Sequence, residues 1–233
     1  MKANALICLF LVSLALDGAL IGANPSWLMI PAALAGWYLA DLASGLVHMY
    51  MDYRPCVPGT GLKDLYFWDG PRDSPEFLAK QREVYARISL FERVVYDFKK
   101  HHPFPDLLGR HSIWYLMKAP VMFVTLPLSL VLNLIFWLTS PPGWLIVGAV
   151  TLLLGASLSQ GFHGALHRSD VGWGVRAMRR VGLLMSASAH KKHHATLTQD
   201  FAVINGWSNP LVNFCTTALL RLRVLRSEGL EPT

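Results

Sequence analysis

Two long runs of the sequence carry no charged residue, and they restrict the chain to folds that shield these runs from water. They are residues 119–138 and 144–162. Each approaches the roughly 20 apolar residues that a helix needs to cross the hydrocarbon layer of a membrane. Two further apolar runs precede them. We therefore predict an all-α membrane protein, a single integral-membrane domain over residues 1–233, with four transmembrane helices at about 5–22, 27–49, 119–138 and 144–164.

The N-terminal run also fits a second interpretation. Residues 5–22 are interrupted only by Asp17, which lies near the far end of the run, where an interfacial position explains it. A signal peptide cleaved after Ala23 would have the same apolar stretch. Cleavage there would leave the other three predicted spans unchanged.

The segments outside the spans, residues 53–118 and 168–233, are predicted to form a helical cap. Glu76–Lys100 places apolar side chains at helical spacing, which indicates one amphipathic helix with Phe77, Val84, Ile88, Phe91, Val95 and Phe98 on its apolar face. Pro103 and Pro105 exclude a continuous helix beyond that point.

The distribution of basic residues predicts which side of the membrane holds this cap. All 21 lysines and arginines lie in Lys2, residues 53–118 and the tail after residue 167, and the two short turns on the other side hold none. By the positive-inside rule the cap and both termini are cytoplasmic, in a bacterial inner membrane or in the endoplasmic reticulum. The net charge of +6 therefore indicates a membrane surface and not nucleic acid.

All nine histidines lie on this same side, at or just beyond the ends of the predicted spans. Three of them, His190, His193 and His194, are spaced i, i+3 and i+4, and on a helix they share one face. Imidazole is the commonest metal-ligating side chain. We predict that the rings meet in a metal site with these ligands: His48, Asp52, His101, His102, His111, His163, His167, His190, His193 and His194.

The positions of these residues distinguish between classes of metal site. A b-type cytochrome or a transporter would place its ligands in the middle of the spans, where this sequence has no histidine. The three cysteines form no CxxC pair, so neither a thiolate site nor a disulfide framework is indicated. Nine imidazoles and Asp52 suit two metal ions with four to six ligands each. Imidazole alone does not distinguish iron, zinc and copper.

Three acidic or amide side chains have more than one interpretation. Asp52 either ligates metal or orients a ligating imidazole. Asp41 precedes His48 on the same side of the predicted helix, and it is either a helix-end polar contact or a group that supports the site indirectly, through a ligand or water. Asn205 either caps a helix or holds a ligating water.

Several motifs resemble those of one family. HxxxH followed by HxxHH after a pair of spans is similar to the histidine boxes of membrane fatty acyl desaturases and hydroxylases. A larger set of motifs resembles the plasmanylethanolamine desaturase family, also called the lipid desaturase domain or Kua family. These motifs are Ala40-Asp41, Ser44–His48 with Asp52, His101-His102 with Arg110-His111, His190–His194, and Asn205–Leu211. The resemblance covers residues 35–215. The sequence departs from it at Met49, in a longer segment between His48 and His101, and after His111.

This resemblance implies an oxidoreductase, namely a di-iron lipid desaturase with two iron ions and O2 as co-substrate. The implied substrate is the alkyl chain of an ether phospholipid, which is converted to a vinyl ether, and the implied partner is a cytoplasmic electron donor of the cytochrome b5 or ferredoxin type. Lys99, Lys100, Lys191 and Lys192 would dock an acidic donor or a lipid head group, or simply follow the positive-inside rule. The alternatives are an acyl-lipid desaturase or hydroxylase with the same centre, and a non-catalytic membrane metal-binding or sensor protein.

Overall fold

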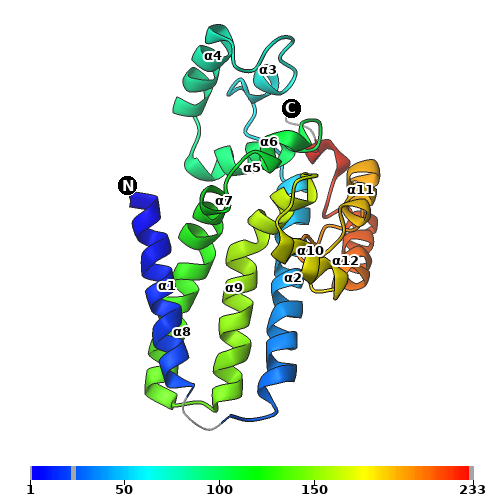
Figure 1. Ribbon diagram of the computed structural model, residues 1–233. Helices are drawn as coiled ribbons and strands as arrows, with labels where there is room; N and C mark the ends of the chain where they lie inside the picture. Colours follow the sequence, from blue (N-terminus) through cyan, green and yellow to red (C-terminus); the bar gives the residue numbers. More distant parts are fainter. Residues whose placement is uncertain (1, 22–24, 231–233) are drawn as a thin grey trace.

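The computed structural model describes residues 2–21 and 25–230, and within these ranges every regular element is a helix (Figure 1). A bundle is formed by α1 (Lys2–Leu20), α2 (Met29–Tyr53), α9 (Gly143–Leu166) and one continuous helical stretch made of α7 (Ile113–Pro120), η1 (Val121–Thr125) and α8 (Leu126–Thr139). The shorter elements are α3 (Leu62–Tyr66), α4 (Pro75–Ala86), α5 (Leu90–Lys100), α6 (Pro105–Gly109), α10 (Trp173–Arg180), α11 (Ala187–Thr196), α12 (Asn209–Arg221) and η2 (Ser227–Gly229).

Three helical stretches of the described residues are long and apolar enough to cross a membrane. They are Met29–Tyr53, Ile113–Thr139 and Gly143–Leu166, and they correspond to the second, third and fourth predicted spans. The first predicted span is the shorter apolar helix Asn4–Leu20, so a total of four spans stays a prediction. The end of that span at residue 22 and the cleavage position after Ala23 lie outside the described residues.

The helical stretch at the third predicted span is longer than predicted and is not uniformly α-helical. It begins in α7 at Ile113, and its residues Val121–Thr125 form a π-helical turn between Pro120 and Pro127. A proline lacks the N–H that an α-helix needs and its ring crowds the preceding turn. A widened turn accommodates both prolines without ending the helix.

The bundle is held together by close contact between α2 and α9, which share more neighbouring residues than any other pair of helices among the described residues. A Cβ atom on Gly36 would collide with the backbone carbonyl oxygen of Gly148, and one on Gly155 would lie 2.6 Å from the Cβ of Ala40. Small residues of this kind let two membrane helices pack backbone to backbone. The two helices are thereby held directly against each other.

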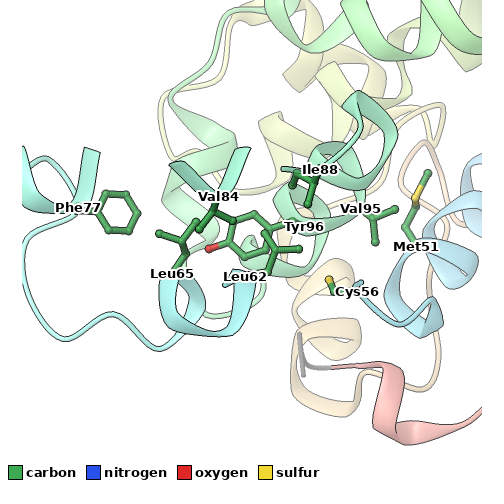
Figure 2. Close-up of a cluster of buried hydrophobic side chains, with 9 residues drawn as sticks. All are labelled: Met51, Cys56, Leu62, Leu65, Phe77, Val84, Ile88, Val95 and Tyr96. Carbon is green, nitrogen blue, oxygen red and sulfur yellow. The ribbon is translucent and has the colours of Figure 1, made fainter. Parts of the chain in front are cut away.

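The amphipathic segment of the cap is two helices, and the prediction of one continuous helix over Glu76–Lys100 is wrong. The chain turns at Arg87–Ser89 between α4 and α5, because the Ser89 hydroxyl accepts a hydrogen bond from the Glu92 N–H and starts a new helix. The turn folds the two apolar faces onto one core. Figure 2 shows this core, which consists of Met51, Cys56, Leu62, Leu65, Phe77, Val84, Ile88, Val95 and Tyr96.

This cap core fixes the position of α5 relative to α2. Met51 is in the last turns of α2, whereas Val95 and Tyr96 are in α5 and are fully buried. In Figure 1, α3 and α4 stand beyond the end of the bundle, and α10, α11 and α12 lie along the side of α2. The ends of α2, α5, α9 and α11 therefore meet at one end of the bundle.

Candidate metal centre

Each histidine-bearing segment reaches this meeting point for a local reason. His48 and Asp52 lie one turn apart near the end of α2, and both are fully buried. His163 is in the last turn of α9, and His167 is the residue that ends it. On α11, the Ser186 hydroxyl caps the helix by accepting from the Ala189 N–H. That helix begins just before the first of its three histidines.

His101 and His102 follow α5 directly. The His101 and His102 N–H groups donate to the carbonyls of Phe98 and Lys99, in a turn that closes the helix. Pro103 cannot continue the helix, so the two neighbouring rings leave the backbone in different directions. The prediction that the prolines exclude a continuous helix is confirmed, because residues 101–103 form a turn.

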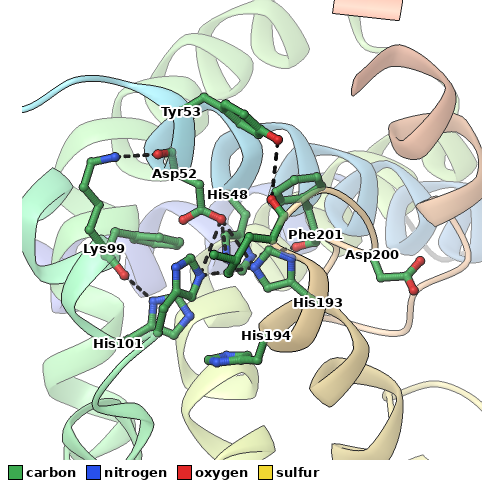
Figure 3. Close-up of polar contacts among 12 residues, drawn as sticks. His48, Asp52, Tyr53, Lys99, His101, His193, His194, Asp200 and Phe201 are labelled. Atoms are coloured by element: carbon green, nitrogen blue, oxygen red, sulfur yellow. Dashed lines mark hydrogen bonds and ion pairs between the residues drawn. The ribbon is translucent and has the colours of Figure 1, made fainter. Parts of the chain in front are cut away.

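The structure brings eight of the nine histidines together with Asp52, in two adjacent groups. The five-histidine group consists of His101, His163, His167, His190 and His194, and the Asp52 group consists of His48, Asp52, His102 and His193. In each group one possible ligand atom per residue lies within 4.8 Å of all the others. Figure 3 shows His48, Asp52 and His193 converging beside His101 and His194.

Distances between ring nitrogens match those of ligands on one ion. His190 Nε2 lies 3.1 Å from His163 Nε2 and 3.2 Å from His194 Nε2. Two nitrogens bound to the same metal at about 2.1 Å stand about 3.0–3.4 Å apart, for angles between 90° and tetrahedral. In the other group, Asp52 Oδ2 lies 3.4 Å from His48 Nε2 and 3.3 Å from His193 Nε2.

Backbone carbonyls fix the orientation of three of the rings. The Nδ1 atoms of His48 and His193 lie 2.8 Å and 2.9 Å from the carbonyl oxygens of Phe201 and Gln199, and His101 Nδ1 contacts the Phe98 carbonyl in the same way. Because a carbonyl only accepts, Nδ1 must carry the proton. The lone pair is then on Nε2, which faces the centre. Sequence reasoning missed this role of residues 199–201, since a carbonyl leaves no mark in a sequence.

Several buried atoms at the centre have no hydrogen-bond partner among the described residues. They include His48 Nε2, both carboxylate oxygens of Asp52, His101 Nε2 and His167 Nε2. A buried carboxylate with no donor and buried nitrogens with no partner cost several kcal/mol unless something satisfies them. Metal cations would bind all of these atoms, so the residues present fit a metal centre.

The rings of the cap are held in the neutral state that a metal needs. Burial, reinforced by neighbouring imidazoles, lowers the pKa of His102 to about 2 and the pKa of His167 and of His194 to about 4. The same causes lower the pKa of His101 and His190 well below its usual range. At neutral pH these nitrogens carry free lone pairs and do not repel a cation.

Three of the residues singled out in the sequence lie outside both groups. His111 is exposed and its ring stacks on Tyr115 at 4.2 Å between ring centroids. Asp41 is buried and binds the loop at 204–208: its carboxylate accepts from the N–H groups of Ile204, Asn205, Gly206 and Ser208 and from the Ser208 hydroxyl. Asn205 Oδ1 accepts from the Trp207 N–H.

The basic residues around the histidines differ in their exposure and in their hydrogen-bond or ion-pair partners. Lys99 is fully buried and donates to the backbone carbonyl of Asp52, so it is not a surface docking residue. The Lys100 Nζ atom forms an ion pair with Asp97 Oδ1 at 2.7 Å. Lys191 and Lys192 are exposed on α11. The sequence interpretation that grouped all four as docking residues is therefore wrong for Lys99.

A comparison with known families agrees with this geometry. The family described as the lipid desaturase domain matches residues 85–222, which is more than half of the 233 residues and includes every histidine except His48. No curated protein and no solved structure matches the chain. The chain belongs to the lipid desaturase domain family, and it has a histidine-rich cluster able to bind metal at the end of its membrane helices.

Proposed function

We propose that this protein is a di-iron, O2-dependent membrane lipid desaturase that forms a vinyl ether from the alkyl chain of an ether phospholipid. The observation that carries the proposal is the pair of adjacent ligand groups at the end of the apolar bundle. Family membership supports desaturation of a lipid. The resemblance of the motifs around His48, His101 and His190 to plasmanylethanolamine desaturases supports the ether lipid.

The two groups divide the ligands between two ions. The five-histidine group would hold one ion, and His48, Asp52, His102 and His193 would hold the other. When bound, two iron ions would supply the means to reduce one O2 to two waters, with two hydrogens taken from the lipid, two electrons from the electron donor and two protons from solvent. A structural zinc needs only four ligands. The number of convergent imidazoles therefore favours a reactive centre with two metals.

The protein's own residues hold the ligands and position the chain. The carbonyls of Phe201, Gln199 and Phe98 keep three rings in one tautomer and one orientation, so little reorganisation is needed when metal binds. His48, His163 and His193 are fully buried, which keeps bulk water away from the reactive carbon. The position of a methylene pair relative to the centre then decides which bond forms.

We further propose that the centre faces the cytoplasm, in a bacterial inner membrane or the endoplasmic reticulum, with both termini on that side. The supporting observation is the absence of lysine and arginine from the two turns at the opposite end of the bundle. A soluble donor such as cytochrome b5 or a ferredoxin would then reach the centre from the cap. Exposed basic residues that such a donor could contact lie next to the ligands in the sequence, namely Lys191 and Lys192 of α11 and Arg168 after His167.

Lipid profiling of cells with and without the protein tests the proposal. We expect a new vinyl ether, loss of that product in the His163→Ala variant, and about two irons per purified chain. A new acyl double bond or hydroxyl would refute the ether substrate but keep the chemistry. No lipid change, or one zinc per chain, would refute desaturation and favour a metal-binding or sensor protein.

A further inference from the structure

The side of the bundle carries a basic helix with one arginine turned inward. Trp173 and Val181, at the two ends of α10, are among the most exposed large apolar side chains, and Arg176 and Arg180 are exposed as well. Arg179 is only partly exposed, and its guanidinium donates to the backbone carbonyl of Ala165 over 3.0 Å. Exposed tryptophan next to arginine is typical of a helix at the level of lipid head groups.

Arg179 lies in the wall of an apolar crevice that is too narrow to admit a water molecule, so a ligand would lie over it and not inside it. The rest of that wall includes Phe162 and Leu166 of α9, Val175 of α10, and Leu184 and Ile204. Ala165, which accepts from Arg179, lies between His163 and His167 in the sequence of α9. The crevice therefore lies beside the turn of α9 that supplies His163 and leads to His167.

The charge of Arg179 is not balanced within the described part of the chain. None of the ion pairs among the described residues includes it, and its Nε is buried without a hydrogen-bond partner. Burial lowers the pKa of Arg179, and no carboxylate opposes this effect. A guanidinium nevertheless stays charged in proteins. Because no acidic side chain of the described residues neutralises this partly exposed guanidinium, it is available to an anionic group from outside the chain.

We propose that Arg179 binds the phosphate of a membrane phospholipid, whose glycerol region lies against the apolar crevice. A planar guanidinium matches phosphate oxygens through paired N–H groups. A free phosphate ion would gain nothing from the apolar walls, whereas a phospholipid has a phosphate and apolar chains joined at the required boundary. If the bound phospholipid is the substrate, this inference rests on the proposed function, because the phosphate would then lie beside the turn of α9 that carries His163.

Lipid binding to the purified full chain, measured by native mass spectrometry, tests the proposal without turnover. The probes are a phospholipid and a diacylglycerol with the same chains, and the variants are Arg179→Gln, Arg179→Lys and the exposed control Arg176→Gln. We expect Arg179→Gln to weaken phospholipid binding about tenfold, as the loss of one charge-assisted contact would. Diacylglycerol binding should stay the same, Arg179→Lys should lie between, and the control should match the unmodified protein.

Unchanged phospholipid binding in Arg179→Gln, or an equal loss of diacylglycerol binding, would overturn the proposal. So would an equal loss in the Arg176→Gln control, because that result would indicate a general surface charge effect. Competition by inorganic phosphate alone at low concentration would identify a free-anion site and also overturn it. Metal content of each variant shows whether the centre is intact. Vinyl ether formation is measured in a separate assay, so a protein that forms no vinyl ether could still bind phospholipid through Arg179.

Discussion

Asp41 lies outside the metal centre, yet its replacement by asparagine should weaken metal binding. One carboxylate oxygen accepts from the N–H groups of Ile204, Asn205 and Gly206 at 2.9–3.2 Å. The other accepts from the Ser208 N–H at 3.0 Å and from its hydroxyl at 2.7 Å. The loop held in this way continues from Phe201 and Gln199, whose carbonyls fix His48 and His193.

The magnitude follows from these five hydrogen bonds. An asparagine in the same place keeps one acceptor oxygen but presents an N–H2 group to the Ser208 N–H, which is then a buried donor without an acceptor. That loss costs about 1–3 kcal/mol, the Ser208 hydroxyl can turn to accept from the new N–H2 group, and the three bonds to the retained oxygen each weaken from charge-assisted to neutral, so the total is roughly 3–5 kcal/mol. Loss of the supporting carbonyls should lower metal affinity about 10–100-fold, as for other groups that orient a ligand.

The effect should be confined to one of the two groups. Gln199 and Phe201 support His193 and His48, both in the Asp52 group, whereas no carbonyl of that loop contacts the five-histidine group in the described residues. We expect Asp41→Asn to retain one tightly bound metal and to bind the second weakly, in metal titrations followed by elemental analysis. The matched control is Asp170→Asn, which removes a carboxylate from a solvent-exposed ion pair with Arg168 and should leave the binding of both metals unchanged.

Two results would refute this reasoning. If Asp41→Asn bound two metals as tightly as the unmodified protein, the loop would not hold the ligands. If both metals were lost equally while thermal unfolding stayed unchanged, the separation of the ligands into two groups would be wrong.

Three further predictions concern the ligands and the bundle. His163→Ala should abolish desaturation and remove about one metal per chain, because His163 belongs to the five-histidine group. His111→Ala, outside both groups, should leave metal content unchanged, and elemental analysis of both variants checks this. Without metal, the free energy of unfolding should be greatest above pH 6.5 and should fall toward pH 4. Burial lowers the pKa of His167 and of His194 from 6.5 to about 4 in the folded chain, so between these pH values the unfolded chain binds more protons. Denaturation of metal-free protein at pH 7 and pH 5 measures this difference, and greater stability at pH 5 would contradict it. Gly36→Ala should lower the free energy of unfolding by about 1–3 kcal/mol, because the new Cβ would collide with the backbone oxygen of Gly148 in α9. An unchanged thermal unfolding temperature would contradict this prediction and show that the two helices can move apart.

The position of the site relative to the membrane bears on what reaches it. His48 and His163 lie near the ends of candidate membrane helices, whereas His102 and His194 lie in the cap and are partly exposed. A lipid approaching from the bilayer and a donor approaching from water would therefore meet the centre from different sides. Lys99 is buried beside the centre, where it donates to the Asp52 carbonyl.

The sequence alone determined the apolar helices and the histidines that each helix carries. Runs without charge identify helices for a membrane, and a spacing of i, i+4 places His163 and His167 on one side of one helix, whichever helices surround it. Pro103 likewise excluded a helix at His101 and His102. Such properties are local, because they depend only on the chain within a few residues.

Tertiary packing decided which ligands share a group. His101 and His102 are neighbours in the chain but belong to different groups, and on α11 His193 joins the Asp52 group while His190 and His194 join the other. Packing also left His111 outside and supplied the carbonyls of residues 199–201. The physical reason is that helical periodicity fixes the faces of one helix, whereas the helices that these faces meet depend on which distant surfaces pack closely enough to exclude water and lipid.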